Sequence, residues 1–540
     1  MRNSTLFFIL SLAISNTCIQ AQNNPPSVQI NAITVDTINR SITLDFDLED
    51  IDGDLLEVNA FLSADSGKAH VVSGISVSGD VGFPITPGQN KSLVLNYTTS
   101  GLASVANQST PWCTVKIVAT DRKRPDIAQM ISLIDSASVY ADMQFLSIPR
   151  HHASAPSGLE LVKDSLVSVF SRTGLQTTRL PFNVGAIAAE NILGRKPGLF
   201  QEENVIIIDG HFDAVPNTPG ADDNATAVAA VLAAARVFEN YHFNKSINFL
   251  GFDLEELGLL GALNYVANSI SSYENIEAVI NGEMLGYYDT TQNSQQIPLG
   301  FNVAFPAAID SINSENNRGI FLFVIGNTQN SSALSSYFDS VARQYVPDVR
   351  SIVLNAPGTG ALTPDLRRSD HAVFWDAGIP ALMITDGADT RNPHYHQISD
   401  NLNTINFPFL VRNIKAMVAT VASLAEPTYA GYDVSQSFIL AQNLQISVEE
   451  NHPLSNFELF PNPSDGDVYL RFPQNVRGEV QISVISMGGK RVLDRKVQAQ
   501  GGETVQIELG QRTKGIFFVK VQIGEYQFAK KLIIHEDHQH

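Results

Sequence analysis

The sequence predicts an α/β domain in the middle of the chain, with helices on both faces of its sheet, and an all-β sandwich on each side of it. The chain has 540 residues, which is too long for one ordinary domain. Residues 140–428 alternate short apolar strands with helical stretches, as an α/β sheet requires. Residues 25–135 and 456–540 consist of short alternating strands separated by turn residues, which is typical of β-sandwiches.

The composition limits the classes of partner and of covalent cross-link. The formal net charge is −20, which argues against nucleic acid and anionic membrane surfaces as partners. The sequence has two cysteines, Cys18 and Cys113. Cys18 lies in a segment that we expect to be removed, so the mature chain would form no internal disulfide. Cys113 lies in a strand-like run, where we expect a buried cysteine that packs as a small hydrophobic residue.

Residues 1–21 have the pattern of a secretory signal peptide. Arg2 supplies the positive start, residues 6–14 form a short apolar run, and Ala21 ends the cleavage site. The apolar run is too short to be a permanent membrane helix. We therefore expect a secreted mature chain without a stable membrane span.

The first predicted sandwich, residues 25–135, contains an acidic turn at residues 47–54 that resembles turns of bacterial immunoglobulin-like or fibronectin-like modules. Ca²⁺ binds several carboxylate oxygens, so this turn is a candidate calcium site of the N-terminal domain. A solvated acidic turn is the favoured interpretation, because the spacing of an EF-hand loop is absent.

In the central domain, the candidate chemistry begins at a strand end. His211 and Asp213 follow the apolar strand 205–208, and ligands collect at such ends in open α/β sheets. A carboxylate two residues from a histidine can orient the imidazole toward a metal ion. Taken alone, this pair indicates little.

Two pairs of acids follow along the chain. Asp222 and Asp223 open an Ala-rich helix predicted over 226–240, where one acid fits a helix N-cap and the other is a candidate ligand. Glu255 and Glu256 end the next strand. Neighbouring carboxylates repel each other unless a cation or a proton lies between them, so one is predicted to bind metal and the other to move protons. A solvated acidic turn is the alternative for the two glutamates.

Two further segments complete the series. Glu283 is predicted to interrupt an apolar strand, which is unfavourable unless the acid is paired or coordinated. Residues 391–400 form a Pro-containing loop that holds Tyr395 and His396. Each of the five segments can be explained by local structure alone. No single structural explanation accounts for all five in this order, which favours a common functional site.

These segments resemble the co-catalytic zinc peptidases that include bacterial secreted leucyl aminopeptidase and glutamate carboxypeptidase II. The resemblance covers residues 140–428, and its strongest motifs are 220–226, 255–261, and 369–374 with 377–381. It implies a mixed-sheet zinc-peptidase domain with helices on both faces and two Zn²⁺ ions. The ligands that it implies, with Asp223 shared by both ions, are His211, Asp223, Glu256, Glu283 and His396.

The resemblance also implies roles beside the metal ions. Glu255 would be the general base and acid, and Asp213 would orient His211. Tyr395 would either donate a hydrogen bond to the oxyanion or pack only as an aromatic side chain. Many members carry Asp at the position of Glu283, and Glu also supplies a terminal carboxylate oxygen.

The function implied is a secreted zinc-dependent exopeptidase, and more narrowly an aminopeptidase, that hydrolyses peptide or protein substrates through a metal-bridging hydroxide. A carboxypeptidase, a dipeptidase and a glutaminyl cyclase of the same fold are the alternatives. A non-enzymatic surface adhesin is the alternative from another class. Because all five ligand positions are retained, the sequence favours two metal ions and hydrolysis over the single-zinc cyclase.

Residues 429–455 are predicted to be a linker or loose strands, followed by the C-terminal β domain over 456–540. The segments 460–466, 488–492 and 515–521, with a basic closing strand, resemble the C-terminal sorting domain of type-nine secretion in Bacteroidetes-like bacteria. This resemblance implies the type-nine secretion machinery as a partner. The protein would pass through the periplasm and be released or attached at the outer-membrane surface. A carbohydrate-binding or adhesive β module is the alternative.

Overall fold

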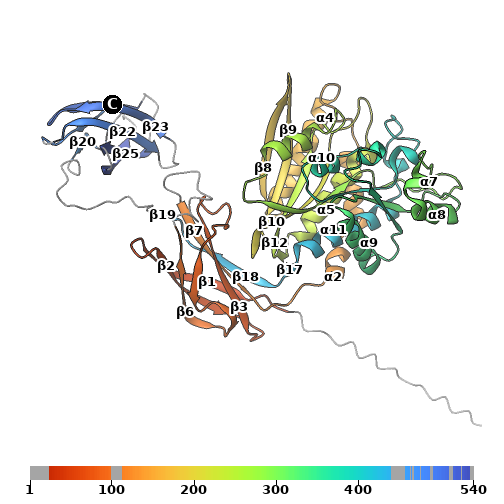
Figure 1. The fold of residues 1–540 in the computed structure, drawn as a ribbon, viewed down its shortest axis with the longest axis horizontal. Helices are drawn as coiled ribbons and strands as arrows, with labels where there is room; N and C mark the ends of the chain where they lie inside the picture. The colour runs from red at the N-terminus through yellow and green to blue at the C-terminus, as the bar shows by residue number, and fades with distance from the viewer. Residues whose placement is uncertain are drawn as a thin grey trace, which may run out of the picture. The chain divides into compact units, whose positions relative to one another are not determined.

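A computed structural model of the chain describes residues 23–98, 112–439, 457–462, 464, 467–474, 476–486, 491–509, 515–523 and 526–534. These residues belong to two compact units, which divide between Phe438 and Ile439. The first unit contains an N-terminal β domain and the central α/β domain, and the second is a small β domain (Figure 1). The signal peptide predicted over 1–21 lies outside the described residues.

The central domain is built on a mixed sheet that has eight strands within the described residues, in the order β15-β14-β16-β13-β10-β12-β9-β8. β10 pairs in parallel with β12 and β13, whereas β9 is antiparallel to β12 and β14 is antiparallel to β16. The predicted mixed α/β fold is confirmed. The strands are β8 (Gln176–Val184), β9 (Ile187–Lys196), β10 (Gln201–His211), β12 (Lys245–Phe252), β13 (Asn275–Gly282), β14 (Leu322–Asn327), β15 (Ser351–Ala356) and β16 (Ala381–Thr385).

Helices cover both faces of this sheet because its inner strands are apolar on both sides. Along β10, Ile206 and Ile208 belong to one buried cluster, and Val205 and Ile207 belong to another. Helices of the first cluster are α2 (Ile127–Ser132), α3 (Ser136–Leu146), α4 (Pro156–Arg172), α5 (Thr226–Phe238), α9 (Ser332–Tyr345) and α11 (Phe407–Ala425). Those of the second are α6 (Leu260–Asn268), α7 (Phe301–Ala304), α8 (Pro306–Ser314) and α10 (His371–Asp376).

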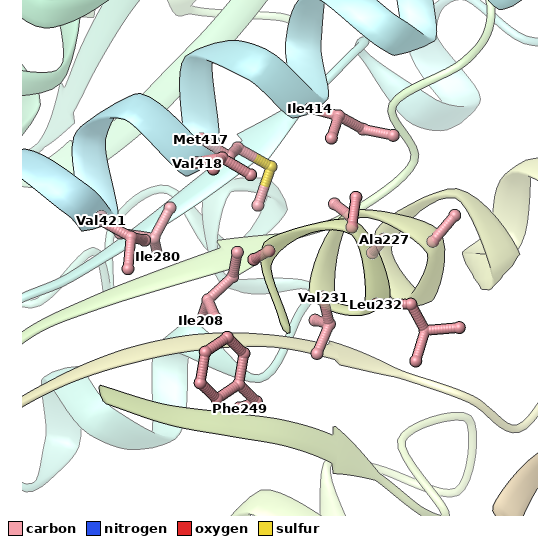
Figure 2. Packing of buried hydrophobic residues seen from close by; sticks show 14 of the residues in the cluster. Ile208, Ala227, Val231, Leu232, Phe249, Ile280, Ile414, Met417, Val418 and Val421 are labelled. Carbon is pink, nitrogen blue, oxygen red and sulfur yellow. The ribbon is translucent and has the colours of Figure 1, made fainter. Parts of the chain in front are cut away.

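Helix α5 lies unusually close to the strands beneath it. Figure 2 shows side chains of α5 and α11 gathered over Ile208 of β10 and Ile280 of β13. A Cβ at Gly210 would lie 2.6 Å from the Cβ of Ala227, and one at Gly282 would lie 2.8 Å from it. Because these two positions are glycines, the first turn of α5 can pack directly against β10 and β13. This packing places the loop before the helix at the ends of those strands.

Helix α11 is, in the described part of the chain, the single helix long and apolar enough to be a candidate membrane span. Its apolar window has a mean hydropathy of 1.3, but 67% of that window is buried within the structure. Ile414, Met417 and Val421 belong to the same buried cluster as the sheet residues (Figure 2). Packing in the domain core therefore accounts for the apolar composition of α11.

The N-terminal β domain consists of two sheets, with the strand orders β1-β2-β6-β4 and β18-β7-β3-β5. Alternate residues of β2, including Leu44 and Phe46, are fully buried, as predicted for a sheet with one apolar face. The strands are β1 (Ser27–Asp36), β2 (Ser41–Glu49), β3 (Leu56–Ser63), β4 (Ser76–Gly79), β5 (Gly82–Ile85), β6 (Gly88–Asn96), β7 (Trp112–Thr120), β18 (Ala430–Val434) and β19 (Phe438–Ile439), the last of which also pairs with β7.

The N-terminal boundary of the central domain differs from the sequence prediction, and the segment after the domain contains a paired strand. The predicted sandwich, 25–135, ends earlier, because β7 stops at Thr120 and α2 packs in the core of the central domain. The segment 429–455, predicted as a linker or loose strands, begins with a strand, because β18 pairs antiparallel with β7. This short segment has little hydrophobic periodicity, and it forms a strand because the ladder groups of β7 need partners. Residues 440–455 lie outside the described residues.

A buried ion pair joins the N-terminal β domain to the central domain. The Nζ of Lys116 on β7 lies 2.8 Å from a carboxylate oxygen of Glu202 on β10, and it also donates to the carbonyl oxygen of Gly198. The backbone N–H of His70 donates to the same carboxylate. Burial alone would raise the pKa of Glu202, but its bonds with His70 and Lys116 lower that pKa to about 2.

Replacing Lys116 with methionine is expected to lower the free energy of unfolding by about 3–5 kcal/mol, because Glu202 would be left as a buried charge without its cation. Urea denaturation at neutral pH measures this change, with the exposed Lys68→Met as the control. The wild-type contribution of Glu202 is present above pH 4.5 and is lost as pH falls toward 2, because its folded pKa lies below the ordinary value. Equal stability of the two variants would contradict the prediction.

The acidic turn that sequence analysis marked as a candidate calcium site lies beside a lysine. Asp50, Asp54 and Asp121 present oxygen atoms within 4.8 Å of one another. The Nζ of Lys123 lies 2.6 Å from Asp54, and Asn23 donates to Asp121. Because the chain supplies a cation and an amide donor of its own here, we do not propose calcium for this turn.

The second unit is a two-sheet β domain. Its sheets have the orders β20-β21-β24 and β23-β22-β25-β26 in the described residues. Alternate residues of β22, among them Val480, Ile482 and Val484, form its core with Val519 and Leu532. The strands are β20 (Glu458–Phe460), β21 (Asp467–Arg471), β22 (Gly478–Ser486), β23 (Arg491–Ala499), β24 (Thr504–Glu508), β25 (Gly515–Ile523) and β26 (Tyr526–Ile534).

Candidate metal centre

The carboxyl ends of three neighbouring parallel strands carry most of the predicted site residues. His211 is the last residue of β10, Glu255 and Glu256 follow β12, and Glu283 follows β13. Because β10 lies between β12 and β13, these side chains meet at one edge of the sheet. One detail corrects the sequence analysis: β13 ends at Gly282, so Glu283 lies just beyond the strand and does not interrupt it.

Asp223 lies between the two histidines of the site. Its Oδ1 is 3.4 Å from Nε2 of His211, and its Oδ2 is 3.2 Å from Nε2 of His396. Asp223 belongs to a short turn, Ala221–Ala225, that precedes α5; its backbone there is not helical, and a cis peptide bond joins it to Asn224. One carboxylate therefore faces both imidazoles, which is the position that a shared ligand of two metal ions needs.

The side chains form two groups of three donors. Within each group, one ligand atom from each residue lies within 4.8 Å of the others, and the groups are His211 with Glu255 and Glu283, and Asp223 with Glu256 and His396. Nε2 of His211 is 3.4 Å from Glu283 and 3.8 Å from Glu255. Nε2 of His396 is 3.3 Å from Glu256. The structure thus brings together all five predicted ligands and the predicted base.

The donor set fits zinc. Imidazole nitrogen and carboxylate oxygen are ligands that Zn²⁺ takes in proteins. Oε1 of Glu256 is buried and has no hydrogen-bond partner, although burying such a group without a partner is costly. A metal ion bound by Glu256 would give this oxygen a partner and remove the cost of burying it.

The electrostatics of the site lead to the same conclusion. Burial, together with the nearby charge of Asp223, raises the pKa of Glu256 to about 7. Burial also holds the pKa of Glu255 well above its ordinary value. Burial would lower the pKa of His396, but Asp223 and Glu256 outweigh it and raise that pKa to about 10. The residues therefore retain protons that a divalent cation would displace, as metal binding to such ligands does.

Asp213 contacts both sides of the centre. Its Oδ1 lies 3.4 Å from Nδ1 of His211. Its carboxylate accepts hydrogen bonds from the backbone N–H groups of Glu255, at 3.1 Å, and Glu256, at 3.2 Å. One carboxylate is therefore placed to orient the imidazole and to fix the turn that carries both glutamates.

Three positioning residues were missed by the sequence analysis. Ser369 donates to Glu283 at 2.8 Å, and Asp400 accepts from the backbone N–H of Asp223 at 3.1 Å. Arg150 is fully buried and donates to the carbonyl oxygens of Phe212 and Gly220. Ser369 lies within the motif 369–374 and Asp400 within the loop 391–400, so both positions carried a signal in the sequence. Arg150 had none, because its contacts with the site are with the backbone of Phe212 and Gly220, which lie 62 and 70 residues away in the sequence.

Replacing His396 with glutamine is expected to reduce the zinc content of the purified protein by about half, because His396 faces only one of the two donor groups. Atomic emission spectroscopy measures this content. His394→Gln is the matched control, since His394 lies in the same loop but contacts Ser399 and Tyr287. An unchanged zinc content in His396→Gln, or an equal loss in the control, would contradict the assignment.

Comparison with known families decides what this domain is. Residues 191–421 match the model of peptidase family M28. The central domain is an M28 peptidase domain. All of the predicted ligands, His211 to His396, lie within the matched part of the M28 domain.

Curated relatives match over the M28 domain. YfbL of Escherichia coli, an uncharacterized protein, is 28% identical over 225 residues, which are 40% of this chain and 65% of YfbL. Aminopeptidase YwaD of Bacillus subtilis is 26% identical over 223 residues, which are 40% of this chain and 41% of YwaD. The chain therefore spans less than two thirds of the length of either relative.

Among solved structures, the LapA aminopeptidase of Legionella pneumophila is similar with 18% sequence identity and a TM-score of 0.44, covering 56% of this chain and 78% of LapA. Outside the M28 domain, residues 458–535 match the secretion system C-terminal sorting domain. This match indicates a protein that is secreted or attached to the cell surface.

Proposed function

We propose that the protein is a zinc-dependent aminopeptidase, which hydrolyses the peptide bond that follows the first residue of its substrate. The observation that carries this proposal is a cavity beside the metal centre. It has a volume of about 310 Å³, and Glu283 and Tyr395 belong to its lining. Its apolar lining includes Ile309, Phe323, Ile325, Leu354 and Met383. A cavity of this kind takes one apolar side chain next to the reacting bond.

The charges around the centre favour the amino end of a peptide over the carboxyl end. Four carboxylates, those of Asp223, Glu255, Glu256 and Glu283, would balance the charge of two Zn²⁺ ions, which leaves no net positive charge for a substrate carboxylate. Arg368 also lines the cavity, but Asp389 pairs with it at 2.6 Å. The α-ammonium group of a substrate therefore suits this site better than an α-carboxylate.

The residues of the chain would share the chemistry as follows. Zinc ions held by His211, Asp223, Glu256, Glu283 and His396 would polarise the scissile carbonyl and lower the pKa of a water molecule. Glu255 would accept the proton of the attacking water and return it to the leaving amine. Burial raises the pKa of Glu255 above its ordinary value, and burial is one of the means by which enzymes adapt a carboxyl group to proton transfer.

The test compares substrates that differ only at the amino end. Leucine p-nitroanilide is expected to release p-nitroaniline, N-acetyl-leucine p-nitroanilide is expected to resist, and chelation of zinc is expected to abolish release. No chelator-sensitive release from the free substrate would overturn the proposal. A zinc content near one ion, with cyclisation of an N-terminal glutamine, would indicate a glutaminyl cyclase instead.

We also propose the route of export. The signal peptide over 1–21 would direct the chain to the periplasm, and the C-terminal domain would then engage the type-nine secretion machinery. The match of residues 458–535 to a sorting domain supports this route. Deletion of residues 456–540 is expected to retain the active enzyme in the periplasmic fraction. Unchanged release into the medium would contradict it.

A further inference from the structure

An arginine contacts the aromatic side chain next to the proposed ligand His396. The Tyr395 ring stacks on the His396 ring, with 3.8 Å between centroids and 19° between planes. The Nη2 of Arg368 donates to the Tyr395 hydroxyl oxygen at 3.0 Å. Arg368 comes from the loop before α10, and Tyr395 comes from the loop that carries His396. Both residues line the cavity beside the metal centre.

The direction of this hydrogen bond constrains the hydroxyl group. A phenol can donate one hydrogen bond and accept others, whereas a guanidinium group can only donate. Arg368 therefore occupies an acceptor position of the Tyr395 oxygen, and the hydrogen of that hydroxyl must point elsewhere. A positively charged donor also polarises the O–H bond, which strengthens the bond that the hydroxyl can give to a negative oxygen.

The guanidinium group is itself held in place from a second side. Its Nη1 donates to Asp389 at 2.6 Å, and its carbon lies 5.5 Å from the centre of the Tyr395 ring. Asp389 engages Nη1 and the Tyr395 hydroxyl engages Nη2, so Arg368 has no free pair of donors to offer a carboxylate on the substrate. Its geometry instead suits the control of one neighbouring hydroxyl group.

We propose that Arg368 is a positioning residue that directs the hydroxyl hydrogen of Tyr395 toward the oxyanion formed at the substrate carbonyl. Arg368 acts through Tyr395, and Asp389 anchors it. This inference rests on the proposed peptidase function and adds a residue that determines how strongly the oxyanion is stabilised. The contact is made only as charge develops, so its loss appears in kcat and leaves KM nearly unchanged.

A double-mutant cycle on the full chain tests the proposal, with leucine p-nitroanilide as substrate. Tyr395→Phe is expected to lower kcat by about 10²-fold, as removal of one oxyanion donor does. Arg368→Met is expected to lower kcat by about tenfold in the wild type and by less than about twofold in Tyr395→Phe. Arg368→Lys, which keeps the charge, is expected to restore part of the rate.

Arg367→Met is the matched control for loss of an arginine from this loop. Arg367 pairs with Asp376 and does not line the cavity, so its effect is expected to be the same with and without the Tyr395 hydroxyl. Zinc content and thermal unfolding of every variant exclude loss of metal or of fold. Inhibition by the phosphonate analogue of leucine, a tetrahedral anion, should weaken in Arg368→Met and Tyr395→Phe alike.

Two outcomes would overturn the inference while leaving the proposed function intact. The first is an equal drop in kcat for Arg368→Met in both backgrounds, which would mean that Arg368 acts without Tyr395. The second is a rise in KM alone, which would make Arg368 a substrate-binding residue. An inactive wild-type enzyme would instead overturn the proposed function, and the inference with it.

Discussion

Replacing Glu255 with glutamine is expected to lower kcat by about 10²- to 10⁴-fold, which is the range that a general base contributes. Glutamine keeps the size of the side chain but cannot accept the proton of the attacking water. Among the residues that are not proposed as zinc ligands, Glu255 is the one whose replacement is expected to lower kcat most. The measurement is steady-state hydrolysis of leucine p-nitroanilide, with zinc content determined on the same sample.

The control for this variant is Glu203→Gln, which removes an exposed glutamate from β10 and should leave both rate and zinc unchanged. Glu255 also lies in one of the two donor groups, beside His211 and Glu283. Zinc content therefore separates two roles. A slow enzyme that retains its zinc supports the base, whereas parallel loss of zinc and rate would show that Glu255 acts as a ligand.

Replacing Asp223 with asparagine is expected to remove most of the bound zinc and to lower kcat by about 10³-fold or more. The reason is that one oxygen of Asp223 faces His211 and the other faces His396, so this residue serves both donor groups. An amide supplies one neutral oxygen in place of two that share a charge. Atomic emission spectroscopy and the p-nitroanilide assay measure the two losses.

The exposed Asp348→Asn is the control for removal of an aspartate charge. Asp223→Asn should lose more zinc than His396→Gln, because His396 belongs to one donor group, whereas Asp223 faces a histidine of each group. If the two variants lose the same amount of zinc, Asp223 is not a shared ligand, and the proposed centre is wrong in that respect.

The sequence predicted the elements that have strong periodicity. The strand 205–208 lies inside β10, and the helix predicted over 226–240 is α5, which ends two residues earlier at Phe238. The convergence of the site could also be predicted, because His211, Glu255 and Glu283 follow successive strands and parallel strands end at one edge. Local pattern and one topological rule were sufficient for these features.

Other features depended on contacts that no local pattern carries. The choice between Asp222 and Asp223 is made by the turn before α5: Asp222 accepts from Gly286 and Asn392, while Asp223 faces the histidines. Arg368 showed no motif of its own, since its role depends on meeting Tyr395 from another loop. The pairing of β18, in a segment predicted as a linker or loose strands, could not be predicted because its partner, β7, lies more than 300 residues earlier.

The return of the chain at β18 makes the M28 domain an insertion within the N-terminal β domain. Strand β7 ends at Thr120 and its neighbour β18 begins at Ala430, so the whole M28 domain lies between two hydrogen-bonded strands of one sheet. The sheet that contains β7 cannot be completed until the M28 domain has been synthesised and the two ends of that domain have come together. Contacts this distant in sequence form slowly, and until then β7 presents an open edge to other chains. Topology thereby sets one constraint on the order of folding: the two ends of the M28 domain must come together before the sheet of the N-terminal β domain is complete.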